Sequence, residues 1–159
     1  RIGIIGTPAT IASRAYGKTI RALRAEVVIH AAACPLFVPL VENGHTDTQV
    51  ARLVVEEYLA PLREARVDTL ILGCTHYPLL KGVIGQYMGP DVALIDVGEE
   101  AAKHVGAFLQ RHNMLTGRSE EGRRRYFVSD AIDNFEKLGS VFLQQQIGGM
   151  VSKVDIENY

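Results

Sequence analysis

The sequence has no tryptophan, only two cysteines and no long apolar run. No stretch approaches the ~18 consecutive apolar residues of a membrane-spanning helix, and nothing resembles a signal peptide, so we expect a soluble cytoplasmic protein without a membrane partner. Two cysteines do not make a disulfide framework, and neither lies in a CxxC pattern or in a His/Cys spacing typical of a metal site. Both are expected to be reduced thiols, and no metal is expected.

An excess of charge of either sign is also absent: 17 Lys and Arg residues nearly balance 18 Asp and Glu residues. The nearest approach to a basic cluster, Arg123-Arg124-Arg125, fits a solvated loop, so no nucleic-acid partner is expected. With 159 residues, 47% of them hydrophobic, the chain can form one globular domain, or one domain and part of another. It opens directly on an apolar run without an initiator methionine, and we therefore expect a piece of a longer protein.

Short apolar runs alternate with longer segments of helical periodicity along most of the chain. Strands are expected at residues 2–6, 27–32, 69–73 and 92–95. Helices are expected through Ala12 to Leu23, from a cap at Thr46 or Asp47 to about Leu62, at 78–87 and at 99–109, with a loop at 36–44. This alternation predicts an α/β fold with a doubly wound, mostly parallel sheet.

The composition changes beyond Arg111. Residues 112–125, HNMLTGRSEEGRRR, are polar and rich in helix breakers, as expected of a linker. A short strand at 126–128, a helix at about 130–143 and a last strand near 151–156 follow. Such a tail buries little by itself, so we expect it to pack on the first domain or on a partner absent from the chain.

Polar side chains follow three of the predicted strands. Because ligands of such sheets bind at the carboxyl ends of the strands, the junctions GTPAT at 6–10, Cys34-Pro35 with the later ENG at 42–44, and GCTH at 73–76 should lie at the binding edge. The third junction places Cys74, Thr75 and His76 in a row. A following helix N-terminus favours the thiolate form of a cysteine, and imidazole titrates near neutrality and can pass a proton. The alternatives are that Cys74 is a small buried hydrophobe and that Thr75 only caps the helix.

The other junctions add a carboxylate and two hydroxyls. Thr7 and Thr10 can cap the first helix, or can bind a ligand carboxylate together with backbone N–H groups. Glu42 lies in an otherwise apolar loop, VPLVENG, where a carboxylate close to His76 would orient the imidazole ring.

The segments IGIIGTPATI, ACPLFVPLVENG and LILGCTHYPLL, in this order and spacing, resemble the bacterial glutamate racemases, cofactor-independent enzymes of the aspartate/glutamate racemase superfamily. The resemblance extends from Arg1 to near Leu109, and more weakly through YFVSDAIDNFEKLGSVFL in the tail. His76 favours glutamate as the substrate, because the related aspartate racemases typically carry a glutamate at this place.

The resemblance implies catalysis by two cysteines on opposite faces of the substrate, one thiolate removing the α-proton while the other thiol returns a proton. It makes Cys74 one of these cysteines, with His76 and Glu42 assisting. The positions expected to contact the substrate are Thr7, Thr10, Thr75 and His76. The family uses no pyridoxal phosphate, metal or other cofactor, commonly forms homodimers, and supplies D-glutamate for peptidoglycan.

The sequence departs from the family in one respect. It lacks the first domain's Asp-Ser and Tyr-Gly motifs and its catalytic Cys-Asn-Thr. Cys34 belongs to the same domain as Cys74 in the family pattern, so we expect a structural role for it. Residues 1–113 are therefore predicted to be the second of two similar α/β domains, 114–125 a linker, and 126–159 a segment that completes the missing first domain. The alternatives are an inactive fragment that at most binds a carboxylate or associates with itself, and a racemase for aspartate or another amino acid.

Overall fold

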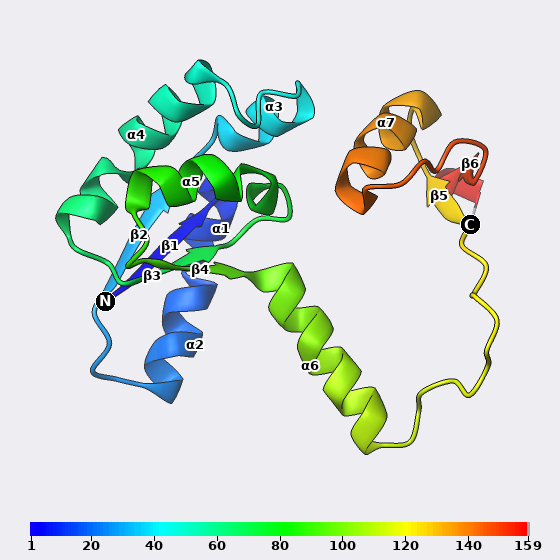
Figure 1. Cartoon of the computed structure of the whole chain (residues 1–159), viewed down its shortest axis with the longest axis horizontal. Coiled ribbons are helices and arrows are strands. Elements are labelled where there is room, and N and C mark those ends of the chain that lie inside the picture. The colour runs from blue at the N-terminus through cyan, green and yellow to red at the C-terminus, as the bar shows by residue number, and fades with distance from the viewer. Residues whose placement is uncertain (159) are drawn as a thin grey trace. The chain divides into compact units, whose positions relative to one another are not determined.

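A computed structural model describes residues 1–158 and divides into two compact units, Arg1–Met114 and a second that begins at Leu115. The first unit is built on a four-stranded parallel sheet in the order β2-β1-β3-β4 (Figure 1). The strands are β1 (Ile2–Gly6), β2 (Ile29–Ala33), β3 (Thr69–Leu72) and β4 (Ala93–Asp96). The predicted doubly wound α/β fold is confirmed for this unit.

The core lies around the two central strands and one face of the sheet. Ile5 of β1 and Leu70 and Leu72 of β3 are fully buried. The helix α4 (Gln49–Glu64) packs on α5 (Lys81–Met88) and on β2. Its buried residues are Ala51, Val55, Leu59 and Leu62. Spaced by three and four positions, these residues form one apolar stripe along the helix.

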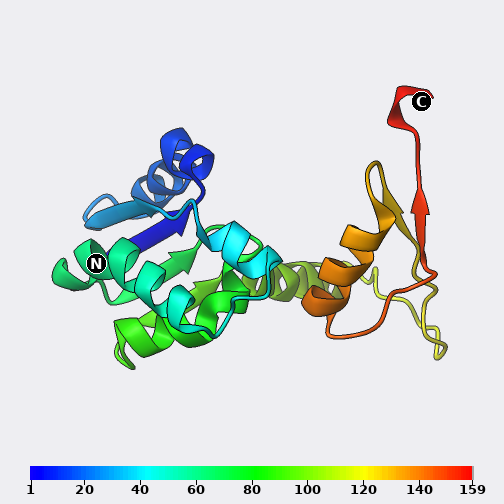
Figure 2. The ribbon, with the colours of Figure 1, turned by 90° about the horizontal axis from the view of Figure 1, so that it is seen from above.

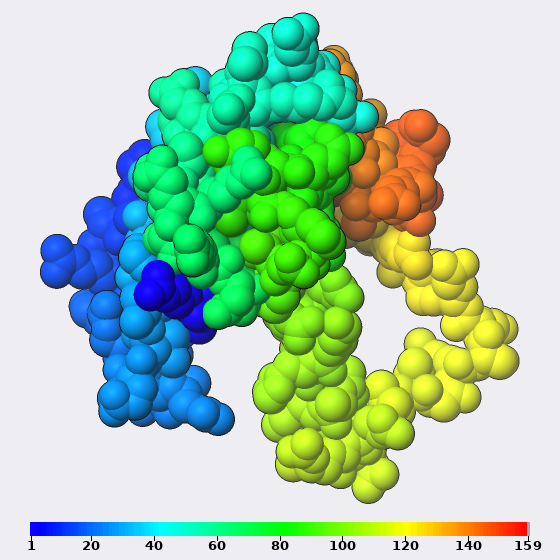
Figure 3. All heavy atoms as spheres, turned by 60° about the vertical axis from the view of Figure 1, so that its left-hand side comes forward, coloured from blue at the N-terminus to red at the C-terminus, as the bar shows by residue number. Residues whose placement is uncertain are grey.

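The opposite face carries α1 (Pro8–Ser13), α2 (Ala15–Leu23) and α6 (Val97–Arg111). In Figure 2, α1 and α2 lie on the other side of β1 from α5. Every residue of α2 and α6 keeps at least intermediate exposure, and α6 extends away from the sheet (Figures 1 and 3). Helices on both faces are what a parallel sheet requires, because both of its faces are apolar.

The structure corrects the first predicted helix, which is two helices. Arg14 adopts a left-handed conformation with φ of 56° between α1 and α2. The apolar face predicted for this segment is not buried in the structure, and Leu23 is 78% exposed.

The loop predicted at residues 36–44 is also wrong, because it contains the helix α3 (Phe37–Glu42). Phe37, Leu40 and Val41 bury the inner side of this helix. Pro39 lies in the first turn, where the missing N–H would have no partner within the helix.

Two other helix boundaries differ from the predictions. Thr48, rather than Thr46 or Asp47, caps α4 through a hydrogen bond that its hydroxyl accepts from the N–H of Ala51 at 3.3 Å. The helix predicted at 78–87 is preceded by a short 3₁₀-helix, η1 (Tyr77–Leu80), before α5 begins.

The second unit contains β5 (Tyr126–Val128), α7 (Ile132–Leu143), β6 (Val151–Lys153) and the 3₁₀-helix η2 (Ile156–Asn158). β5 and β6 pair in parallel, as expected of two strands joined by a crossover helix. The predicted order of strand, helix and strand is confirmed, although the last strand ends at Lys153. The final residue of the predicted segment 126–159 lies outside the described residues.

Candidate active site

The carboxyl ends of the four strands form one level edge. Gly6 is in register with Ala33, and Leu72 with Asp96. The connections that leave the adjacent strands β1 and β3 run to opposite faces of the sheet, which makes the space between them the switch point of the doubly wound fold. Ligands of such folds bind at this point. Thr7 follows β1 directly and Cys74 follows β3 after one glycine.

Gly73 is the residue that fixes where the thiol-bearing turn leaves the sheet. Its N–H donates to the carbonyl of Ile5 at 2.8 Å, which continues the β1–β3 ladder beyond Leu72. A Cβ atom at this position would lie 2.7 Å from the same carbonyl oxygen and 3.2 Å from the ring of Tyr16. Only glycine fits here without a shift of the backbone.

Cys74 is a free, partly exposed thiol at this edge. Its carbonyl accepts a hydrogen bond from the N–H of Tyr77 at 3.2 Å, which closes the turn that carries Thr75 and His76. The α-helix begins only at Lys81, so the helix that directly follows the turn is the four-residue η1. The first residue of α5 therefore comes seven positions after Cys74.

His76 meets a carboxylate from a different junction. Its Nε2 lies 3.2 Å from Oε1 of Glu42, the last residue of α3, and its Nδ1 lies 3.3 Å from the hydroxyl of Thr75. An ionised carboxylate can only accept, so this geometry favours the tautomer with hydrogen on Nε2, which leaves Nδ1 to accept from Thr75. The side chain of His76 is 22% exposed and that of Glu42 is 44% exposed, so the pair remains open to a ligand. Thr75 is not the cap of η1, contrary to one of the sequence alternatives.

Thr7 and Thr10 hold the start of α1. The Thr7 hydroxyl caps this helix by accepting from the N–H of Thr10 at 3.3 Å, and the two hydroxyl oxygens lie 3.0 Å apart. The structure thus shows the capping function that the sequence offered for Thr7. Both hydroxyls are partly buried at the carboxyl end of β1.

Cys34 has the opposite environment to Cys74. It is fully buried, and burial raises the pKa of its thiol to about 12. Such a thiol stays protonated at neutral pH and does not exchange a proton readily. The backbone of Cys34 makes the polar contacts that link the two turns. Its carbonyl accepts hydrogen bonds from the N–H of Phe37 at 3.2 Å and from the hydroxyl of Tyr77 at 2.9 Å.

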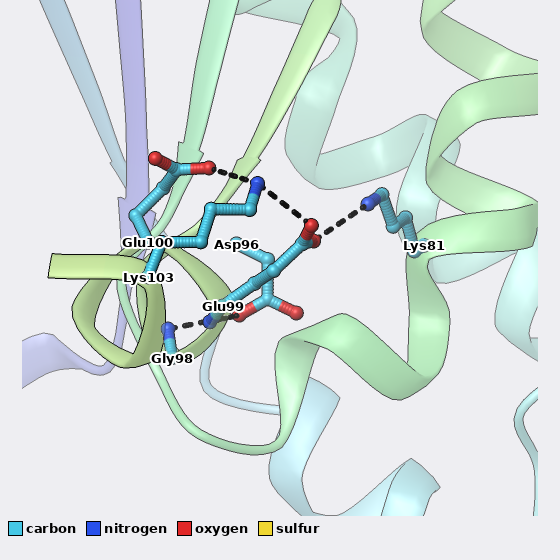
Figure 4. Close-up of polar contacts among 6 residues, drawn as sticks. All are labelled: Lys81, Asp96, Gly98, Glu99, Glu100 and Lys103. Atoms are coloured by element: carbon cyan, nitrogen blue, oxygen red, sulfur yellow. Dashed lines mark hydrogen bonds and ion pairs between the residues drawn. The ribbon is translucent and has the colours of Figure 1, made fainter. Parts of the chain in front are cut away.

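One cluster at the same edge was missed by the sequence reasoning (Figure 4). Asp96 ends β4 and caps α6, accepting from the N–H groups of Gly98 and Glu99 at 2.9 and 3.2 Å. Glu99 in turn pairs with Lys103 at 2.8 Å and lies 3.9 Å from Nζ of Lys81, the first residue of α5. An Asp at the end of an apolar run with a Glu three positions later was the available signal, because this spacing is typical of a helix N-terminus.

Among residues 1–158, no group of three or more His, Cys, Asp or Glu side chains could hold a metal ion. Within the same range, no helix is long and apolar enough to cross a membrane.

Comparison with known proteins identifies the family. Residues 1–105 match the family described as Asp/Glu/Hydantoin racemase. The chain belongs to this family. A curated glutamate racemase from Geobacter metallireducens is 50% identical over 157 residues, which cover 99% of this chain and 58% of that protein. A glutamate racemase from Listeria monocytogenes is 42% identical over 143 residues, which cover 90% of this chain and 54% of that protein.

Solved structures of the family agree with the fold. The glutamate racemase of Francisella tularensis, in complex with D-glutamate, has a TM-score of 0.90 and 33% identity, covering 99% of this chain and 59% of that one. A glutamate racemase from Bacillus anthracis has a TM-score of 0.89 and 37% identity, covering 98% of this chain and 57% of that one. The chain thus spans little more than half the length of the relatives it matches.

Proposed function

We propose that this chain is part of a glutamate racemase, which interconverts L-glutamate and D-glutamate, and that it supplies one wall of the active site. The observation that carries the proposal is the set of side chains at the switch point of the sheet. A partly exposed thiol, Cys74, lies in the same turn as His76, which a carboxylate from another junction holds at 3.2 Å. The glutamate racemases that are 50% and 42% identical to the chain support glutamate as the substrate.

In the proposed reaction Cys74 exchanges a proton with the α-carbon of glutamate. As a thiolate it takes the α-proton: the C–H bond breaks, an S–H bond forms, and the electron pair stays on the α-carbon next to the carboxyl group. A thiol on the opposite face then donates its proton to that carbon, which inverts the configuration. In the reverse direction the two sulfur atoms exchange functions, so no cofactor is needed.

The neighbouring groups have supporting functions in this proposal. His76, held by Glu42, assists proton exchange at Cys74 and contacts the substrate together with Thr75. Thr7 and Thr10 at the end of β1 offer hydroxyl groups to a substrate carboxylate, as the resemblance to the family implies. D-glutamate formed in this way would serve peptidoglycan synthesis.

The second thiol should come from outside this chain. The sequence contains two cysteines, and Cys34 is buried with a pKa of about 12. We therefore propose that residues 1–113 are the second of two α/β domains, that 114–125 are a linker, and that the tail from residue 126 completes a first domain that carries the opposite cysteine. The complete protein is proposed to form a homodimer in the cytoplasm.

A racemisation assay on the complete protein with L-glutamate and L-aspartate as separate substrates tests the proposed activity. We expect conversion of glutamate and none of aspartate. Turnover of aspartate instead, or of neither amino acid, would contradict the assignment. The chain of residues 1–159 alone should not racemise glutamate, and turnover by it that depends on Cys74 would show that the opposite thiol is not required from elsewhere.

A further inference from the structure

Three aromatic side chains join the two junctions that carry His76 and Glu42. We call this group, Phe37, Tyr58 and Tyr77, the aromatic cluster. The ring of Tyr77 meets that of Phe37 edge-on at 5.1 Å between centroids, and Phe37 lies 5.6 Å from Tyr58. Tyr77 and Phe37 are completely buried. Edge-to-face pairs of this kind stabilise a fixed ring geometry beyond the area they bury.

The hydroxyl of Tyr77 adds a directional link between the same junctions. It donates to the carbonyl of Cys34 at 2.9 Å, across 43 positions of sequence, in a buried setting. That carbonyl also accepts from the N–H of Phe37 at 3.2 Å, which closes the turn leading into α3. One backbone oxygen therefore fixes both the turn after β2 and the turn after β3.

The position of these links in the chain explains their consequence. Tyr77 directly follows His76, and Phe37 is the first residue of the short helix that ends at Glu42. The α3 and η1 segments also pack against each other. The distance between the imidazole and the carboxylate thus depends on where two separate turns are held. The Tyr77 hydroxyl joins the buried bases of these turns through its hydrogen bond to the Cys34 carbonyl.

We propose that Tyr77 is a positioning residue: its hydroxyl bond to Cys34 and its ring contact with Phe37 hold the imidazole of His76 against the carboxylate of Glu42. The effect of Tyr77 on catalysis rests on the proposed function. Its effect on the position of the imidazole does not depend on that function. Burial raises the pKa of the Tyr77 hydroxyl, so this group remains a donor throughout the physiological pH range. In Tyr77→Phe the ring contact stays while the Cys34 carbonyl loses its second donor.

The test is a long-range proton–nitrogen correlation spectrum of the isotope-labelled chain at neutral pH, which reports the tautomer of each histidine ring. His76 is assigned by the signals that disappear in His76→Gln. The wild-type ring should show hydrogen on Nε2, and Glu42→Ala should abolish this preference. We expect Tyr77→Phe to shift the His76 signals toward a mixture of both tautomers.

Tyr87→Phe is the control, because it removes a tyrosine hydroxyl from α5, where the ring lies 4.9 Å from the Arg63 guanidinium and outside both turns. It should leave the His76 signals at their wild-type positions. Wild-type His76 signals in Tyr77→Phe would overturn the proposal, and so would a shift of equal size in Tyr87→Phe. If Tyr77→Phe does not fold, Phe37→Leu removes the ring contact instead. A mixture of His76 tautomers in Phe37→Leu would then support the proposal, and wild-type His76 signals would overturn it.

Steady-state kinetics of the complete protein distinguish this proposal from the proposed function. Tyr77→Phe should lower kcat roughly 10- to 100-fold, the range expected when a catalytic group is misplaced, with a smaller change in KM. An unchanged kcat would overturn the positioning function while leaving the racemase assignment intact. Absence of racemisation in the wild type would overturn the assignment, whereas the tautomer experiment would still test the link.

Discussion

The two thiols of the chain show how surroundings decide chemistry. Cys34 follows β2 and Cys74 follows β3, on either side of β1, yet one thiol is fully buried and the other is partly exposed. Desolvation disfavours the charged thiolate and raises the pKa of the buried Cys34 thiol to about 12. The same residue type is therefore protonated and inaccessible in one turn and accessible to solvent in the other.

Alkylation should distinguish these thiols. With excess iodoacetamide at mildly alkaline pH, the folded chain should take up a single label, on Cys74, because the thiolate is the reactive form and Cys34 is both buried and protonated. Mass spectrometry of the peptides locates the label. Cys34→Ser should leave the labelling unchanged and Cys74→Ser should abolish it, whereas labelling of Cys34 in the folded chain would contradict its buried position.

The side chains of the site were partly readable from sequence. Cys74, Thr75 and His76 are contiguous, so a single strand-end motif was sufficient to nominate them. The contact of His76 with Glu42 joins residues 34 positions apart, and only the shared sheet edge and the family resemblance suggested it. The bond from Tyr77 to Cys34 was not predicted, because no local pattern encodes a side chain that reaches a distant carbonyl.

At the end of β3, the backbone packs too closely around Gly73 to admit a side chain. Gly73→Ala should destabilise the chain by about 1–3 kcal/mol, the usual cost of overpacking, because the new Cβ would lie 2.7 Å from a backbone oxygen. Urea unfolding measures this. Gly106→Ala in α6 is the control: nothing lies within 4 Å of its Cβ position, and alanine should stabilise the helix by about 0.5–1 kcal/mol. Equal effects at both positions would contradict the close approach at Gly73.

The start of α6 allows a test by pH. The pKa of Glu99 is lowered mainly by its hydrogen bond with Lys103 and also by the charges of Lys103 and Lys81. A lowered carboxyl pKa stabilises the fold above the unfolded pKa, and this contribution is lost as the pH falls through the folded value. In a carboxyl-carbon NMR titration, Lys103→Met should raise the Glu99 pKa, whereas Lys137→Met in the second unit should not. An unchanged titration in Lys103→Met would contradict the pairing.

The strands β1, β3 and β4 were the most predictable elements, because each is a mainly apolar run that stops at a glycine or an aspartate. The helices were less predictable, since their breaks depend on tertiary structure. Arg14 separates α1 from α2, although it is neither a proline nor a glycine, the residues that usually mark such a break. The segment predicted as a loop at 36–44 contains Pro39, but this proline lies in the first turn of α3, where a proline does not end a helix.

Considered as a whole molecule, the two units differ in how well each buries its apolar residues. The first has a layered core around its sheet, whereas the second fully buries Ile147 and leaves Phe127 58% exposed. Segments this short seldom fold without additional stabilisation. Residues 115–159 as a separate peptide should therefore be largely unfolded by circular dichroism, and residues 1–114 should unfold cooperatively. A cooperative transition of the peptide would contradict the proposal that it needs a further part of the protein.

The central claim is that Cys74 is one of two thiols that exchange the α-proton of glutamate. The most direct measurement is the rate of D-glutamate formation by the complete protein in the variants Cys74→Ser and Cys34→Ser. We predict that Cys74→Ser lowers kcat by roughly 10²- to 10⁴-fold, the usual contribution of a positioned acid/base group, and that Cys34→Ser leaves it close to wild type. Undiminished racemisation in Cys74→Ser, or an equal loss in Cys34→Ser, would contradict the account.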